Sequence, residues 1–327
     1  MTADNNTALG YFALKANTTG AGNTAIGYGA LDANSTGSYA VAIGQNALGA
    51  NTNSYNVAVG TIALASNTSG AQNNAVGYNA GGAVTTGSYN NFFGYGNGAA
   101  VTTGNGNNAY GNATLAACTT GGNNAAFGGN ALSAVTTADY NVGLGSNAGI
   151  SITTGHSNIA IGRNCMYATV TGNYNIGIGR NALYELTSGV ENVMVGYAAG
   201  DAITTGNYNV GVGKQALSGV TTAGNNVGIG NEAGKAITTA SDNTAVGFGS
   251  LIAATTGGYN VAVGSRALDA NTTGTTNVAV GTDALGGNTT AGDNVAIGKS
   301  ALLVNNESNN VELALRLWML LLQLHQM

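Results

Sequence analysis

Residues 260–274 read NVAVGSRALDANTTG, and close copies of this stretch fill almost the whole chain of 327 residues. In each copy a glycine ends the NVAVG segment, and we call it the marker glycine. Consecutive markers lie 17 residues apart, except for Gly44 and Gly60, which lie 16 apart. The eighteen markers are Gly10, Gly27, Gly44, Gly60, Gly77, Gly94, Gly111, Gly128, Gly145, Gly162, Gly179, Gly196, Gly213, Gly230, Gly247, Gly264, Gly281 and Gly298. A period this strict, without apolar stripes of helix length, is typical of a solenoid in which one repeat makes one coil.

The segment before each marker glycine predicts a short strand, because valines and isoleucines two positions apart alternate with a small residue. The residue directly before the marker is apolar in all eighteen copies, as in Ile43 and Ile297, so we expect it to point into the core. The Ala-Leu pair that follows, as in Ala47 and Leu48, predicts a second short buried strand. The Thr-Thr-Gly segment then predicts a turn.

The sequence therefore predicts an all-β fold, a parallel β-solenoid or β-roll of about eighteen 17-residue coils, in one domain over residues 1–311. Residues 312–327 are apolar and break the pattern, and this tail is too short, and too interrupted by Arg316, to span a membrane. A back-translation of residues 311–323 with one inserted nucleotide reads VGIGTEALDAATT, which is a further repeat. We interpret the tail as a frameshift product and expect that it forms no ordinary coil.

Composition excludes most kinds of chemistry. The chain has 54 glycines, no proline, 8 Lys and Arg, 13 Asp and Glu, and a formal net charge of −5. Because its few cations form no basic stripe, we expect no nucleic-acid partner. Two cysteines and two histidines leave little material for a metal site or a catalytic triad, so we expect no enzyme, no metal and no cofactor. Residues 1–10 lack the basic and apolar regions of a signal peptide.

Asparagine stands four residues before the marker in seventeen of the eighteen copies, and only Ala40 departs from this rule. In stacked coils about 4.8 Å apart, each side-chain amide can bond to the next, so we expect a structural ladder rather than a ligand site. The ladder positions that we single out are Asn23, Asn56, Asn141, Asn175, Asn209, Asn260, Asn277 and Asn294.

Tyrosine recurs at the position just before this asparagine. Other copies carry polar residues there, so the position tolerates water, and a row of exposed rings could contact a glycan or a host protein. The alternative is that these rings only cover the edges of the coils. The tyrosines are Tyr39, Tyr55, Tyr89, Tyr140, Tyr174, Tyr208 and Tyr259.

The two cysteines and His156 indicate no reactive site. Cys118 and Cys165 lie about three coils apart, and this axial separation of about 14 Å exceeds the reach of a disulfide. We expect both to be unpaired and small structural residues. His156 lies in a turn with no recurring ligand beside it.

The motif N-V-A-I/V-G followed by x-x-A-L, as in residues 260–268 and 277–285, resembles the head repeat of trimeric autotransporter adhesins of the YadA-like kind. Copies that include Thr-Thr-Gly are also similar to repeat regions of phage tail-fibre proteins. The resemblance covers residues 6–311. It implies a left-handed parallel β-roll in a homotrimer, displayed at the cell surface, outside the cell or on a virion. We also expect the Ala/Gly face of so narrow a coil to need a partner, which favours association about a threefold axis.

These patterns favour an adhesive extracellular fibre or head domain that mediates surface attachment without catalysis. A phage tail-fibre shaft is the alternative, and an ice-binding solenoid with a threonine array is a further one. A carbohydrate-acting enzyme would need paired carboxylates in a groove. The carboxylates Asp139, Glu185, Glu191 and Asp201 are scattered along the sequence.

Overall fold

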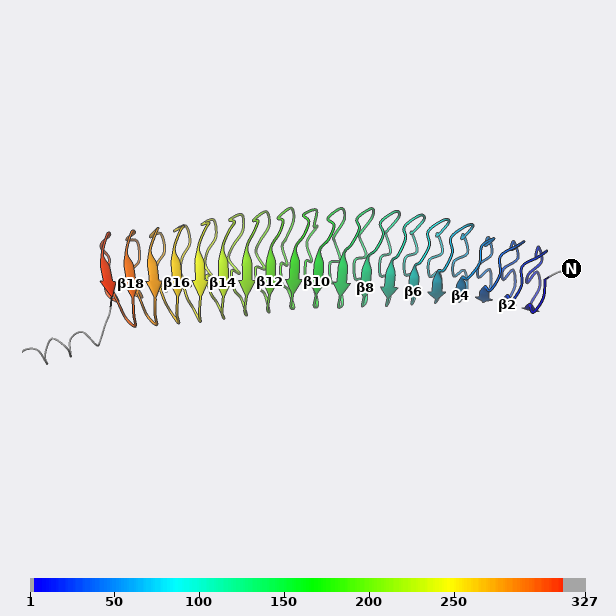
Figure 1. Cartoon of the computed structure of the whole chain (residues 1–327), viewed down its shortest axis with the longest axis horizontal. Coiled ribbons are helices and arrows are strands. Elements are labelled where there is room, and N and C mark those ends of the chain that lie inside the picture. The colour runs from blue at the N-terminus through cyan, green and yellow to red at the C-terminus, as the bar shows by residue number, and fades with distance from the viewer. Residues whose placement is uncertain (1–2, 314–327) are drawn as a thin grey trace, which may run out of the picture. The chain divides into compact units, whose positions relative to one another are not determined.

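The computed structural model describes residues 3–313, in two compact units that we treat separately, Met1–Asn173 (unit 1) and Tyr174–Met327 (unit 2). Every strand has three residues, and neighbouring arrows run side by side in Figure 1. The strands of unit 1 are β1 Thr7–Leu9, β2 Thr24–Ile26, β3 Val41–Ile43, β4 Val57–Val59, β5 Asn74–Val76, β6 Asn91–Phe93, β7 Asn108–Tyr110, β8 Ala125–Phe127, β9 Val142–Leu144 and β10 Ile159–Ile161. Those of unit 2 are β11 Ile176–Ile178, β12 Val193–Val195, β13 Val210–Val212, β14 Val227–Ile229, β15 Thr244–Val246, β16 Val261–Val263, β17 Val278–Val280, β18 Val295–Ile297 and β19 Val311–Leu313.

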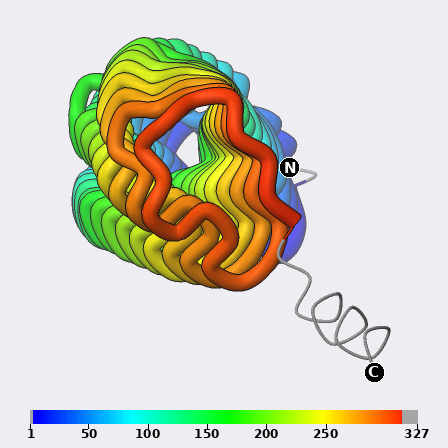
Figure 2. Tube along the Cα trace, turned by 90° about the vertical axis from the view of Figure 1, so that its left-hand side faces the viewer, coloured from blue at the N-terminus to red at the C-terminus, as the bar shows by residue number. Residues whose placement is uncertain are grey.

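Each strand pairs in parallel with the same segment of the next coil. In unit 1, Val41 pairs with Val57, so the register survives the one coil of 16 residues. In unit 2, Val210 pairs with Val227, and the coils drawn in yellow to red in Figure 2 follow one another with the same outline. The predicted all-β parallel solenoid of 17-residue coils is therefore confirmed in both units.

The marker glycine ends the strand for a steric reason. Gly27 has a φ of +132°, which side chains of L residues rarely adopt. A Cβ atom on Gly27 would lie 2.6 Å from the carbonyl oxygen of Gly44 in the next coil. Only glycine therefore lets the backbones of stacked coils approach at this corner.

The predicted second strand is wrong, although its residues are buried as expected. Ala47 and Leu48 are fully buried, but Asn46 and Leu48 have φ angles of +52° and +50°, and the segment is a succession of turns. Left-handed residues interrupt an extended chain, so no strand can form there. The same geometry explains why glycine replaces leucine at this position in some coils, at Gly81, Gly149, Gly200 and Gly234, whose φ angles lie between +55° and +61°.

Coils without this leucine are filled by their neighbours. A Cβ atom on Gly200 would lie 2.7 Å from the sulfur of Met194 and 2.9 Å from Cδ1 of Ile203. Met194 stands at the strand centre, where most coils carry alanine or glycine. Phe92 does the same in unit 1, since its ring would meet a Cβ atom on Gly81 at 2.7 Å. Large and small residues therefore compensate between adjacent positions of the core.

The strands face the opposite way from the prediction. The central residue points inward, as Ala42 does with no exposed surface, and the residue before the marker points outward. Ile43 is 37% exposed, Leu144 47% and Ile297 43%. A period of two fixes which residues share a face but not which face is buried. So thin a coil has room at the strand centre mainly for alanine or glycine, so the larger residues lie outside.

The last strand extends beyond the boundary that the sequence suggested at Val311. Glu312 and Leu313 belong to β19 and pair with Ala296 and Ile297 of β18. A carboxylate oxygen of Glu312 accepts a hydrogen bond of 2.6 Å from the backbone N–H of Leu302. The remaining predictions for the tail, including the frameshift, fall on residues 314–327 and lie outside the described residues.

Candidate interaction face

The outward residues of the strands form two parallel rows, which we call the apolar face. Row 1 contains the first residue of each strand and row 2 contains the third. In unit 2 every one of these residues is apolar except Thr244. Row 1 of unit 2 consists of Ile176, Val193, Val210, Val227, Thr244, Val261, Val278, Val295 and Val311. Row 2 of unit 2 consists of Ile178, Val195, Val212, Ile229, Val246, Val263, Val280, Ile297 and Leu313.

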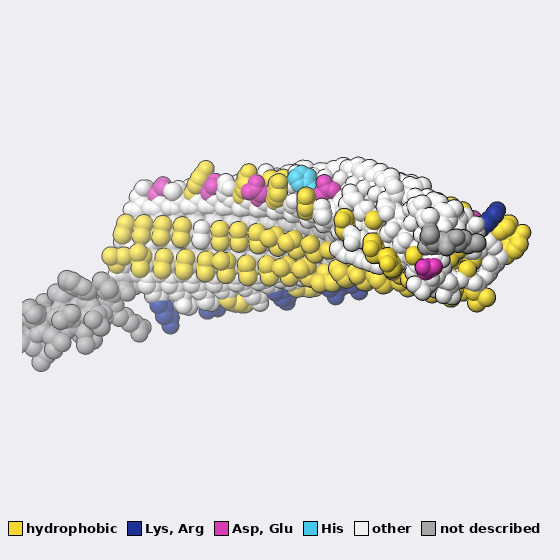
Figure 3. All heavy atoms as spheres, turned by 45° about the vertical axis from the view of Figure 1, so that its right-hand side comes forward, with side chains coloured by type: hydrophobic (Ala, Val, Ile, Leu, Met, Phe, Trp, Pro, Cys, Tyr) yellow, Lys and Arg dark blue, Asp and Glu magenta, His cyan; other side chains and the backbone are white. Residues whose placement is uncertain are grey.

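The residues of this face are half-buried or exposed, and none of them is fully buried. Val261 and Val263 are each 36% exposed, and Ile229 is 41% exposed. Figure 3 shows the two rows of unit 2 as parallel yellow bands, with one white gap in one of them. Contiguous apolar patches larger than a few hundred Å² mark interaction sites on most proteins. The expectation that the Ala/Gly side would need a partner is therefore corrected, because that side is the core and the Val/Ile side is the surface.

Row 1 of unit 1 begins with two threonines, Thr7 and Thr24, and further along it contains a longer departure from the apolar pattern, which we call the polar-aromatic block. Its row 1 carries Asn74, Asn91 and Asn108, and its row 2 carries aromatic rings. The Nδ2 of Asn74 donates to Oδ1 of Asn91 at 2.8 Å, and Asn91 donates in the same way to Asn108 at 2.8 Å.

The rings of this block stack on one another. The centroids of Phe93 and Tyr110 lie 4.9 Å apart, and those of Tyr110 and Phe127 lie 4.8 Å apart, with interplanar angles of 2° and 3°. Because the rings lie face to face, they present their edges to the surroundings. The block therefore has a flat amide row beside a flat row of ring edges.

The two edges of the apolar face carry opposite charges. We call the positions five and six residues before the marker the acidic edge, because all charged residues at these positions are Asp or Glu. We call the position directly after the marker the basic edge, because all charged residues at this position are Lys or Arg. Figure 3 shows the magenta side chains along one side of the yellow bands and the dark blue ones along the other. The acidic edge consists of Asp4 and Asp139 in unit 1 and of Glu191, Asp242 and Asp293 in unit 2. The basic edge consists of Arg163 in unit 1 and of Arg180, Lys214 and Lys299 in unit 2.

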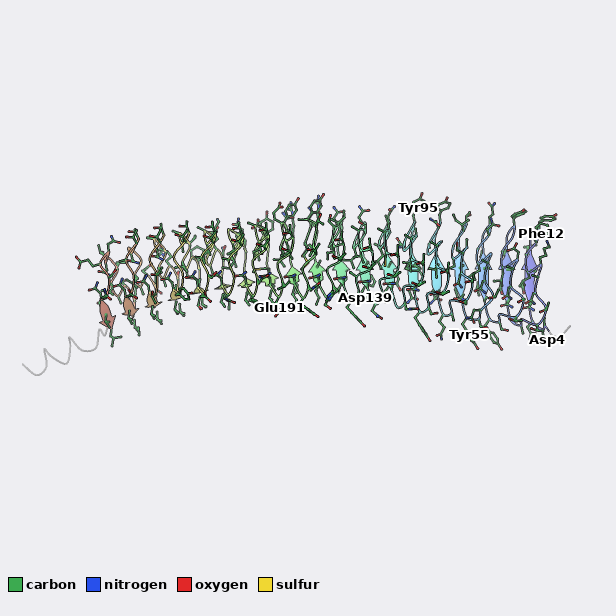
Figure 4. All side chains as sticks on the ribbon, turned by 90° about the horizontal axis from the view of Figure 1, so that it is seen from above. Asp4, Phe12, Tyr55, Tyr95, Asp139 and Glu191 are labelled. Atoms are coloured by element: carbon green, nitrogen blue, oxygen red, sulfur yellow. The ribbon has the colours of Figure 1, made fainter. Side chains whose placement is uncertain are left out.

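The predicted contact tyrosines lie on the acidic edge and are exposed by 53% to 66%. In Figure 4 Tyr55 and Asp139 project on one side of unit 1 and Tyr95 on the other. Tyr39 and Tyr55 stack with their centroids 5.4 Å apart. All seven tyrosines have φ angles between +57° and +62°, a region that bulky residues enter rarely and at a cost in free energy. An open depression of about 480 Å³ lies where Tyr174 and Glu191 meet Val193 of row 1.

The asparagines at the ladder positions Asn23, Asn56, Asn141, Asn175, Asn209, Asn260, Asn277 and Asn294 are all fully buried. Oδ1 of Asn260 accepts the backbone N–H of Asn277 at 3.0 Å and its Nδ2 donates to the turn carbonyl of Gly274 at 2.9 Å. Direct amide-to-amide bonds also occur, such as the 3.2 Å bond from Asn277 to Asn260. Each ladder residue thus joins the strand of one coil to the next coil and to the turn.

The threonine pairs also bond along the stack. The hydroxyl of Thr85 donates to the carbonyl of Thr102 at 3.2 Å, and that of Thr255 donates to the carbonyl of Thr272 at 3.1 Å. The first threonine of these pairs therefore uses its hydroxyl to satisfy the neighbouring backbone. The second threonine, such as Thr86, is exposed in the turn.

The titratable residues inside the coils are few. Burial raises the pKa of the Cys118 thiol to about 11 and that of Cys165 to about 12. The backbone N–H of His156 donates to Oδ1 of Asn173 at 2.9 Å. Burial, together with the nearby Glu185 carboxylate, raises the pKa of Asp201, so the structure brings together two of the four carboxylates that the sequence scatters. Within residues 3–313, no three His, Cys, Asp or Glu side chains lie close enough to hold a metal ion.

Sequence reasoning missed the apolar face itself, because the strand phase was assigned the wrong way round. The usable signal was residue size, since the strand centre is alanine or glycine in nearly every coil while its neighbours are large. Searches against protein-family models and curated proteins found no match to this chain. No helix among residues 3–313 has the length and apolarity needed to cross a membrane.

Proposed function

We propose that this chain is a structural part of an adhesive extracellular fibre or head, and that parallel copies of it associate through the apolar face. The observation that carries the proposal is the exposed pair of Val/Ile rows in unit 2 between edges of opposite charge. Burying apolar surface is the main favourable term in most protein association, at about 25 cal/mol per Å². The role is mechanical and adhesive, and it requires no catalytic group.

The charges favour parallel copies over antiparallel ones. When two copies of unit 2 face each other in parallel, the edge with Glu191 and Asp293 meets the edge with Lys214 and Lys299. An antiparallel pair would instead place acid against acid and base against base, which is unfavourable. Any rotation axis parallel to the stack therefore brings opposite charges together.

The resemblance to adhesin heads supports three copies about such an axis. In this arrangement the apolar faces meet in the centre, whereas the tyrosines of the acidic edge stay near the rim. These exposed rings are the proposed contact with a host-surface protein or glycan. A tail-fibre shaft on a virion would use the same assembly.

Sedimentation of the full chain tests this proposal. We expect a trimer for the unchanged chain and a monomer for the double variant Val210→Lys and Val278→Lys, which places like charges on row 1. The matched control is Thr222→Lys with Thr290→Lys, because both threonines are exposed in turns, and it should remain a trimer. A chain that stays monomeric at every concentration, or a row 1 variant that still associates, would contradict the proposal.

A further inference from the structure

We propose that the polar-aromatic block of unit 1 fixes the axial register between associated copies. The partner is a second copy of this chain, and the inference therefore rests on the self-association proposed above. It assigns to Asn74, Asn91 and Asn108 a role in specificity rather than in affinity.

A uniform apolar face cannot define a register by itself. Strands β16, β17 and β18 present Val/Val, Val/Val and Val/Ile to the outside, so one coil looks almost like the next. Two such faces that slip by one coil, about 4.8 Å, rebuild nearly all of their contacts. Slippage is a known weakness of repetitive strand surfaces, and it needs a distinctive residue to prevent it.

The asparagines of the block supply that distinction. Each of Asn74 and Asn91 gives one N–H to the amide of the next coil, so each amide keeps a second N–H for a partner. In register, and with row 1 of all three copies nearest the threefold axis, the amide rows meet at that axis and can bond to one another, while the acidic edge of each copy still meets the basic edge of the next. A slip by one coil places Val57 opposite Asn74 and Ala125 opposite Asn108, which leaves buried amide groups without partners. A single buried asparagine sets the register of coiled coils by the same physics.

The aromatic row adds a steric distinction. Phe93, Tyr110 and Phe127 stand between Val76 and Leu144 in row 2, so a slipped copy would bring a ring opposite a smaller side chain. The stacked rings cover one another's faces, and a sugar normally packs on a ring face. This geometry favours a second copy of the chain over a glycan as the occupant of the block.

Cross-linking between two tagged chains tests the register. One chain carries Val142→Cys and the other Ile159→Cys, which lie one coil apart in row 1, in a background with Cys118→Val and Cys165→Ala. The two are refolded together, treated with a short bismaleimide, and the linked peptides are identified by mass spectrometry. We expect same-site links to exceed mixed-site links at least tenfold.

The variant Asn74→Val, Asn91→Val and Asn108→Val should keep the trimer but raise the mixed-site fraction at least fivefold. The control Thr244→Val removes the one polar residue of row 1 in unit 2 and should leave the ratio unchanged. Equal same-site and mixed-site links in the unchanged block would overturn the register proposal while leaving the self-association intact. A triple valine variant that keeps its register would also overturn the register proposal. This holds even if the variant loses its retention on a glycan array. A monomer in sedimentation would overturn both proposals.

Discussion

Strands β16 to β18 and strands β5 to β8 occupy the same position of the same repeat, yet they present different surfaces. The first group exposes only valine and isoleucine, and the second exposes asparagine amides and ring edges. Their inner residues are equivalent, since Ala109 and Ala279 are both fully buried. The buried residues therefore determine the fold of the coil, and the outward residues can vary to suit the binding partner.

If the inner positions are equivalent, a buried charge should destabilise both regions equally. We expect Ala109→Asp in β7 and Ala279→Asp in β17 each to destabilise their unit by more than about 4 kcal/mol, because an unpaired carboxylate would enter a dry core. Thermal unfolding followed by circular dichroism measures this. The outward controls Asn108→Asp and Val278→Asp should stay folded. A mild effect at either inner position would show that the two coils are not built alike.

Alkaline pH should lower the stability of unit 1 more than that of unit 2, because both cysteines lie in unit 1. Burial raises the pKa of Cys118 from 9.0 to about 11, so the unfolded chain ionises near pH 9 while the folded unit keeps its proton. The stabilisation is complete below pH 9 and is lost as the pH rises to about 11, with a loss of about 3 kcal/mol for a shift of two pKa units. Hydrogen exchange resolved by unit measures it. Cys118→Val should remove the Cys118 part of this loss, and only the double variant with Cys165→Ala should remove it all, because burial also raises the pKa of Cys165, to about 12. An equal loss in unit 2 would contradict the assignment.

The asparagine ladder should contribute equally to both regions. We expect Asn107→Ala beside the block and Asn277→Ala in unit 2 each to lower stability by about 1–3 kcal/mol, since a buried N–H loses its acceptor. Conversely, Ala40→Asn should fill the one gap in the ladder and raise stability by about 1 kcal/mol. Denaturant midpoints report all three. A neutral Ala40→Asn would indicate that the gap serves some other purpose.

The smallest effect is expected at the acidic edge. Replacing Tyr89 or Tyr259 by asparagine should raise stability by up to about 1 kcal/mol, because asparagine tolerates the left-handed conformation better than tyrosine. Melting temperatures measure the change. The coil of Gly106 is the reference, because it carries glycine at the position that Tyr89 and Tyr259 hold in their coils. A fall in stability would mean that the rings contribute packing that outweighs their strain.

The sequence predicted the repeat, the parallel strands and the burial of Leu48, because the 17-residue period and the marker glycines leave few alternatives. It could not give the phase of each strand, since alternation fits Ala42 or Ile43 equally well on the inside. It also missed the left-handed turns, because leucine is a poor predictor of positive φ. The sequence did not reveal the polar-aromatic block, because the role of Asn74 and Asn91 depends on the strand phase, which places their amides on the outer surface.

The exchange of volume around Met194 also bears on how such a gene can grow. Met194 occupies the space that side chains at Gly200 in its own coil and Gly211 in the following coil would need. Copying only the coil of Met194 would stack two thioethers in adjacent layers, and copying only the coil of Gly211 would leave an empty space. Duplications that preserve the filling must therefore carry neighbouring coils together, so the inherited module of this protein is longer than its 17-residue period.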